Sequence, residues 1–167
     1  MTRVLFTGSF DPVTQGHADI IARLSRIFPE VVVTVFQNAE KAHLFTPEER
    51  LAMLSAVAAA YPNVMVDVSS GYVADYVKAH KIDLIVRGIR NPDDVAYERE
   101  MAEYNKAHSG VETMYFFPER EYASLSSTAA REYLMRGEIP VSLVPDEIIP
   151  FLFGYFEKKG IDKSRIK

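Results

Sequence analysis

The 167-residue chain contains no cysteine, has no excess of positive charge and has no long apolar run. Without cysteine the chain cannot form disulfides, use thiolate catalysis or build cysteine-ligated zinc sites, and its composition is consistent with the cytoplasm. No apolar stretch approaches the roughly 20 residues of a membrane span, and the N-terminus lacks a signal-peptide pattern. We therefore expect a soluble, cytoplasmic protein with no membrane partner.

The charge balance argues against nucleic acid as a partner. The formal net charge is -4, and binding to nucleic acid requires many lysines and arginines to neutralise phosphates. Hydrophobic residues at 48% and charged residues at 25% are typical of a globular protein, and the length fits one domain. His43, His80 and His108 lack metal-ligand spacing, so we predict no protein metal site and assign these histidines structural or surface positions.

Short β-branched runs alternate with longer helical patterns along the chain. Strands are expected at residues 4–7, 31–36, 63–68, 82–86 and 114–117, and helices at 16–28, 47–57, 73–80, 93–107, from 126 and from 145. This alternation predicts a single α/β domain with a Rossmann-like, doubly wound, five-stranded parallel sheet and flanking helices. We place the domain at residues 1–157, including a C-terminal helix, and expect a flexible tail at 158–167.

The first predicted strand leads directly into a candidate phosphate-binding turn. Its sequence is Gly8-Ser9-Phe10-Asp11-Pro12-Val13-Thr14-Gln15-Gly16-His17. Gly8 permits the turn, the small Ser9 lets a phosphate approach the backbone, and His17 stands at a helix start that favours anions. Asp11 before proline is expected to form a turn. An ordinary strand-to-helix loop fits the same spacing, so this motif alone leaves both interpretations open.

Two further segments carry groups suited to phosphates. Arg87 and Arg90 flank Gly88-Ile89 after the fourth strand and could clamp a phosphate chain, although solvated loop charges are the alternative. Ser126-Ser127-Thr128 opens a late helix, where its hydroxyls and amides suit either a second anion or plain N-capping. Because ligands gather at the carboxyl ends of parallel strands, we expect all these segments to meet at one edge of the sheet.

Several of these segments resemble a known family. Gly8 to His17 and Ser126 to Glu132 are similar to the two signatures of the nucleotidylyltransferase superfamily. The segment from Arg87 to Asn105, together with Lys41 and the run from Phe45 to Arg50, resembles those that mark the phosphopantetheine adenylyltransferases. The likeness covers the chain to about residue 157.

The resemblance implies adenylyl transfer from ATP to 4'-phosphopantetheine, giving dephospho-coenzyme A and pyrophosphate. It also implies Mg2+ bound with ATP, a homohexamer, and coenzyme A as feedback inhibitor. The implied catalytic residues are His17, Lys41 and Arg90. The implied phosphopantetheine-binding residues are Ser9, Lys41, Val73 and Arg87. The implied ATP-binding residues are Ser9, Phe10, His17, Gly88, Ile89, Arg90, Glu98, Tyr122, Ala123, Ser124, Leu125, Ser126, Ser127 and Thr128.

Two alternatives remain. Another nucleotidylyltransferase, acting on nicotinate mononucleotide or using CTP on glycerol phosphate or phosphocholine, would keep His17 and the Ser126 turn but not the segment 87–105. The second alternative is a regulatory module that binds nucleotide without turnover. Charges placed at the reacting phosphate argue against it, because a protein that needs only affinity has no use for them. The aromatic C-terminal helix fits either core packing or a subunit interface.

Overall fold

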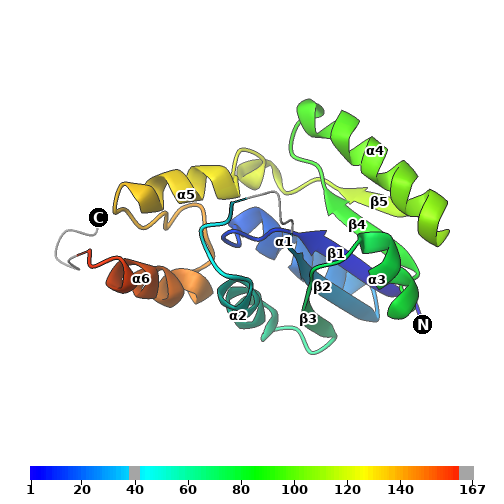
Figure 1. Ribbon diagram of the computed structural model, residues 1–167, viewed down its shortest axis with the longest axis horizontal. Helices are drawn as coiled ribbons and strands as arrows, with labels where there is room; N and C mark the ends of the chain where they lie inside the picture. The colour runs from blue at the N-terminus through cyan, green and yellow to red at the C-terminus, as the bar shows by residue number, and fades with distance from the viewer. Residues whose placement is uncertain (38–41, 162–167) are drawn as a thin grey trace.

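The computed structural model describes residues 1–37 and 42–161, which form one α/β domain (Figure 1). The strands are β1 (Arg3–Gly8), β2 (Glu30–Phe36), β3 (Val64–Ser69), β4 (Leu84–Gly88) and β5 (Thr113–Phe116). The helices are α1 (Gln15–Ile27), α2 (Pro47–Ala58), α3 (Val73–Ala79), α4 (Pro92–Ser109), α5 (Ser127–Met135) and α6 (Ile149–Lys158), with 3-10 turns η1 (Arg120–Tyr122) and η2 (Asp146–Ile148). None of the helices in the described ranges is both long and apolar enough to cross a membrane.

The five strands form one parallel sheet in the order β3-β2-β1-β4-β5. The chain therefore moves outward from β1 to β3 and then returns to place β4 on the other side of β1. This reversal puts a topological switch point between β1 and β4, where ligands of such sheets bind. The predicted fold class is confirmed.

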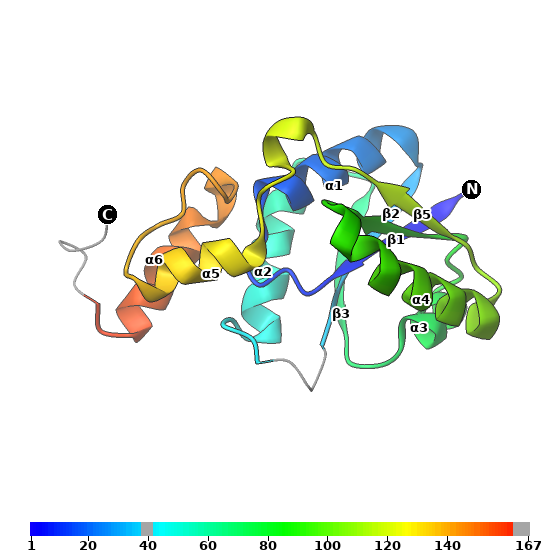
Figure 2. The ribbon, with the colours of Figure 1, turned by 90° about the horizontal axis from the view of Figure 1, so that it is seen from above.

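Helices cover both faces of the sheet, as Figure 2 shows from above. Alternating side chains of β1 explain this arrangement, because successive residues of a strand point to opposite faces. Val4 and Phe6 belong to the larger core with residues of α1, α2, α5 and α6, whereas Leu5 packs in a smaller cluster with Tyr76 and Val77 of α3. The doubly wound arrangement follows from this alternation.

Local sequence signals fix several element ends. A capping box begins α2: Thr46 Oγ1 accepts from the Glu49 backbone N–H at 3.2 Å, and Glu49 Oε2 accepts from the Thr46 backbone N–H at 2.9 Å. The prediction for β4 was wrong by two residues, since Ile82 lies outside the ladder. Its backbone N–H donates to Val77, and its buried side chain packs in the smaller cluster.

The C-terminal helix α6 packs mainly on the larger core. Leu152 and Phe156 are fully buried, Tyr155 is partly buried against the same core, and Phe153 is 37% exposed. Core packing therefore accounts for most of the aromatic content of this helix. Lys158, the first residue of the expected tail, ends α6; residues 162–167 lie outside the described ranges, so the flexible tail stays a prediction.

We expect Leu152→Ala to lower the free energy of unfolding by about 2–5 kcal/mol, because it empties a fully buried position of the core shared with the sheet. The matched control is Met135→Ala, whose side chain is 66% exposed and should change stability by less than about 0.5 kcal/mol. Urea denaturation followed by circular dichroism measures both. Equal, small effects would show that α6 contributes little to the domain core.

Candidate active site

Two adjoining pockets open at the carboxyl ends of the strands. The first pocket has a volume of about 310 Å³ and lies at the switch point, and the second has about 570 Å³. The residues that line both are Thr7, Gly8, Ser9, Arg87 and Glu98. The three segments predicted to meet at one edge of the sheet, residues 8–17, 87–90 and 126–128, all contribute to the lining of the first pocket.

The first pocket is lined largely by polar side chains and by the starts of two helices. Its other lining residues are Phe6, Phe10, Asp11, Thr14, Gly16, His17, Ile20, Ala42, His43, Gly88, Arg90, Asp94, Pro118, Tyr122, Leu125, Ser126, Ser127, Thr128 and Arg131. Helix starts present unpaired N–H groups and a positive dipole end, so α1 and α5 both favour an anion here. The pocket therefore suits a phosphorylated ligand.

The second pocket has mostly apolar walls. They come from the end of β2, the start of α3 and one side of α4, with Phe36, Tyr72, Val73, Tyr97 and Met101 among them. Such walls suit an uncharged, flexible chain, and the polar residues shared with the first pocket stand at one end of it.

His17 is held at the start of α1 by a capping box with Thr14. The Thr14 backbone N–H donates to His17 Nδ1 at 3.0 Å, and the His17 backbone N–H donates to Thr14 Oγ1 at 3.4 Å. The Phe10 ring contacts the His17 imidazole edge to face, at a centroid distance of 4.9 Å, and further limits the rotation of the imidazole. Because Nδ1 accepts a backbone hydrogen bond, the proton of the neutral ring resides on Nε2.

The surroundings keep this imidazole neutral. Burial, the largest cause, and the positive charges of Arg90 and Arg87 together lower the pKa of His17 to about 3. At neutral pH the ring is therefore a fixed, uncharged Nε2–H donor at the wall of the first pocket. It can stabilise negative charge by hydrogen bonding, but it has no proton to transfer as an imidazolium.

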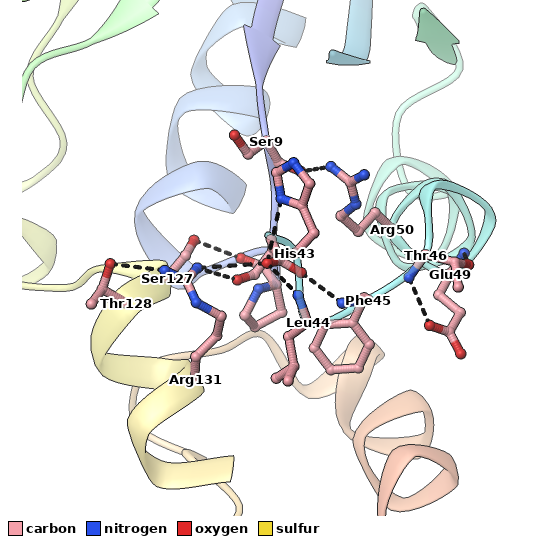
Figure 3. A network of polar contacts seen from close by, with 12 residues as sticks. Ser9, His43, Leu44, Phe45, Thr46, Glu49, Arg50, Ser127, Thr128 and Arg131 are labelled. Carbon is pink, nitrogen blue, oxygen red and sulfur yellow. Dashed lines mark hydrogen bonds and ion pairs between the residues drawn. The ribbon is translucent and has the colours of Figure 1, made fainter. Parts of the chain in front are cut away.

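Asp11 ties the first loop to two other segments of the site, whose residues Leu44, Phe45 and Arg131 are drawn together in Figure 3. Its side chain is almost fully buried and accepts hydrogen bonds from the backbone N–H groups of Leu44 and Phe45, each at 2.9 Å. The Asp11 carbonyl accepts from Arg131 Nη1 at 2.7 Å. Sequence reasoning assigned Asp11 only a turn and missed this role, because its partners are distant in the chain.

Arg87 and Glu98 form a bidentate ion pair where the two pockets meet. Arg87 Nε donates to Glu98 Oε2 at 2.9 Å and Nη2 donates to Oε1 at 2.6 Å, while Nη1 donates to the carbonyl and hydroxyl of Thr7 at 2.6 and 2.9 Å. Burial lowers the pKa of Arg87, but the hydrogen bonds and charge of Glu98 outweigh burial and raise it overall. These four bonds leave one N–H of Arg87 Nη2 without a partner among them. The positive charge of Arg87 balances the negative charge of Glu98.

The predicted turn at α5 has the expected cap and additional contacts. Ser126 Oγ accepts from the Ala129 backbone N–H at 3.0 Å, which confirms the N-cap. Ser127 Oγ donates to the Pro12 carbonyl at 2.8 Å, and Thr128 Oγ1 accepts from Arg131 at 3.1 Å. These bonds hold the start of α5 against the loop that follows β1.

The structure brings most of the predicted site residues to the two pockets. Arg90 lines the first pocket with a half-exposed side chain 3.4 Å from Asp94, and Val73 lines the second. The pocket linings do not include Ile89, Ala123 or Ser124. Lys41 lies outside the described residues. Sequence reasoning missed other lining residues, among them Asp11, His43 and Arg131 in the first pocket and Phe36 and Tyr72 in the second.

Residues 1–37 and 42–161 contain no cluster of three or more histidine, aspartate or glutamate side chains able to hold a metal ion. In the first pocket, Asp11, Asp94 and Glu98 each lie within 4 Å of an arginine nitrogen. Their charges are therefore already balanced by arginine. A metal ion in this pocket would take its ligands from the bound phosphates and water.

The first pocket, at the switch point of the parallel sheet, combines two helix starts, the neutral His17 and the guanidiniums of Arg87 and Arg90, and this arrangement suits phosphate groups. Residues 5–133 match the model of the cytidylyltransferase-like family. A protein of Frankia alni that is named phosphopantetheine adenylyltransferase is 42% identical over 153 residues, covering 89% of this chain and 94% of the relative. A protein of Clostridium tetani with the same name is 41% identical, and the match covers 89% of this chain and 94% of the relative. A protein of Clostridium kluyveri with that name is 37% identical, and the match covers 95% of this chain and 97% of the relative.

The chain is therefore a nucleotidyltransferase of the cytidylyltransferase-like class. Within that class it belongs to the phosphopantetheine adenylyltransferase family.

The protonation state of His17 can be measured directly. We expect ring nitrogen chemical shifts in the ligand-free protein to show protonated Nε2 and unprotonated Nδ1 from about pH 5 to 8, with no titration near 6.5. His17→Gln assigns the signals by their loss. A ring that titrates near 6.5, or that carries its proton on Nδ1, would contradict the geometry of the capping box.

Proposed function

We propose that this protein transfers the adenylyl group of ATP to 4'-phosphopantetheine, giving dephospho-coenzyme A and pyrophosphate. The observation that carries the proposal is the pair of pockets that share Ser9 and Arg87, the first with more polar than apolar lining and the second with more apolar than polar lining. ATP occupies the first pocket and the pantetheine arm the second, so that the acceptor phosphate meets the α-phosphate at their junction. The name carried by the similar proteins supports this assignment.

The nucleotide is bound mainly through its phosphates. The starts of α1 and α5, with their positive dipole ends, and the guanidinium of Arg90 surround the first pocket and favour the triphosphate. Tyr122 and Leu125, in the segment before α5, provide the less polar side of this pocket for the adenine.

The acceptor is held at the junction. The remaining N–H of Arg87 is available to its phosphate, because Glu98 and Thr7 occupy the other four. Ser9 lies beside it, and Val73 lies at the start of α3 along the arm. Lys41, in the loop after β2, is assigned a contact with both reacting phosphates by resemblance alone.

The chemistry requires alignment more than proton transfer. The acceptor phosphate is already an anion; its oxygen bonds to the α-phosphorus while the bond from that phosphorus to the bridging oxygen of pyrophosphate breaks. His17 Nε2–H donates to an α-phosphate oxygen and stabilises its charge in the transition state. Fixed donors of this kind are effective because they need no reorganisation during reaction.

Four further properties are part of the proposal. Mg2+ accompanies ATP and neutralises phosphate charge, held by phosphate oxygens and water because the pocket carboxylates are paired with arginine. Coenzyme A shares the pantetheine arm and would compete for the second pocket.

Exposed apolar side chains on or near α4 offer surface for a homohexamer, namely Tyr72, Val95, Tyr97 and Tyr104. We also propose a cytoplasmic location, with which the cysteine-free composition is consistent.

The substrate assignment is tested by pyrophosphate release from purified protein. Mg-ATP is offered with 4'-phosphopantetheine, nicotinate mononucleotide or glycerol 3-phosphate in separate reactions, and CTP is tested in parallel. We expect release with ATP and phosphopantetheine alone. Release only with another acceptor or with CTP would overturn the substrate, and no release despite tight ATP binding would favour a regulatory module.

His17→Ala should lower kcat by about 10²–10³ while the dissociation constant for ATP changes only severalfold, because the lost hydrogen bond strengthens in the transition state. Steady-state kinetics and calorimetry with Mg-ATP provide the two values. His80→Ala, which alters an exposed histidine at the end of α3, is the control and should leave both unchanged. Unimpaired turnover by His17→Ala would refute this mechanism.

A further inference from the structure

His43 is a second imidazole at the wall of the first pocket, and the proposed mechanism gives it no task. Its side chain is 14% exposed, and its Nδ1 lies 3.6 Å from Oδ2 of Asp11. The Nε2 atom is buried and has no hydrogen-bond partner within residues 1–37 and 42–161. A buried polar atom without a partner is unfavourable, which indicates a partner that arrives with the ligand.

The backbone next to His43 is held in place by the same carboxylate. The two residues that follow, Leu44 and Phe45, donate their backbone N–H groups to Asp11 at 2.9 Å each. Asp11 therefore restrains both the main chain at His43 and the Nδ1 side of its ring. An imidazole restrained in this way can meet a ligand with little loss of conformational freedom.

The surroundings of His43 attract anions. Arg131 Nη1 lies 3.8 Å from the same Oδ2 atom of Asp11, and the buried Arg50 donates to the Ser9 carbonyl at 2.9 Å. The two guanidiniums leave a net positive charge around one carboxylate, which favours a phosphate chain. Arg131 also donates to Thr128, so this positive group is continuous with the start of α5 (Figure 3).

We propose that His43 binds the β- or γ-phosphate of ATP through Nε2–H, with the Nδ1 side of its ring facing Asp11. The two histidines divide the nucleotide between them: His17 serves the α-phosphate, and His43 holds the part that leaves as pyrophosphate. The inference rests on the proposed adenylyl transfer.

Calorimetric titration with Mg-ATP and with AMP tests this division, because AMP lacks the two outer phosphates. We expect His43→Ala to weaken ATP binding about tenfold and to change AMP binding by less than about twofold. The KM for pyrophosphate in the reverse reaction should rise about as much as the dissociation constant for ATP. His43→Gln, whose side-chain amide can donate from a similar position, should bind ATP more tightly than His43→Ala.

The matched control is His108→Ala, an exposed histidine of α4 outside both pocket linings, which should bind both nucleotides as the wild type does. Wild-type affinity for ATP in His43→Ala would overturn the inference. Equal weakening of ATP and AMP would also overturn it, since that result indicates a disturbed pocket and not a lost phosphate contact. Wild-type protein that binds no ATP would instead refute the proposed function.

Discussion

One buried carboxylate holds together the segments that form the first pocket. Asp11 accepts from backbone groups 33 and 34 residues further along the chain, and its carbonyl accepts from Arg131, 120 residues away. A carboxylate removed from water is strongly unfavourable unless such donors satisfy it, so the loop after β1, the approach to α2 and the start of α5 are fixed relative to one another. The two helix starts that favour phosphate binding thereby face a common cavity.

This constraint explains why the site can act with few titrating groups. His17 is neutral because burial and two arginines oppose its protonation, and its Nδ1 is occupied by the Thr14 backbone, so Nε2–H has one orientation. Arg87 is fixed by Glu98 and Thr7 at the junction of the pockets. Each group is a preorganised donor, and such donors suit a reaction between two phosphates, in which orientation and charge dominate.

Local patterns made the fold and much of the site predictable from the sequence. The alternation of β-branched runs and helical patterns gave the parallel sheet, and the caps at Thr46 and Ser126 depend on residues only three positions away. The sequence did not reveal hydrogen-bond partners that lie far apart along the chain. Asp11 before proline reads as a turn whether or not backbone donors from residues 44 and 45 reach it. The pairing of Arg87 with Glu98 joins a strand to a helix 11 residues later, a relation that no helical or strand periodicity encodes. The start of β4 was misplaced because Ile82 is buried by packing on α3 without joining the ladder.

The central claim is that the acceptor phosphate attacks the nucleotide directly, with both substrates aligned by fixed donors and no covalent enzyme intermediate. The stereochemical course at the α-phosphorus tests this claim most directly. With ATP made chiral at that phosphorus by sulfur substitution, a single in-line displacement inverts the configuration in the dephospho-coenzyme A analogue, and inversion is the result we predict. Retention would require two displacements through an adenylylated side chain and would contradict the account.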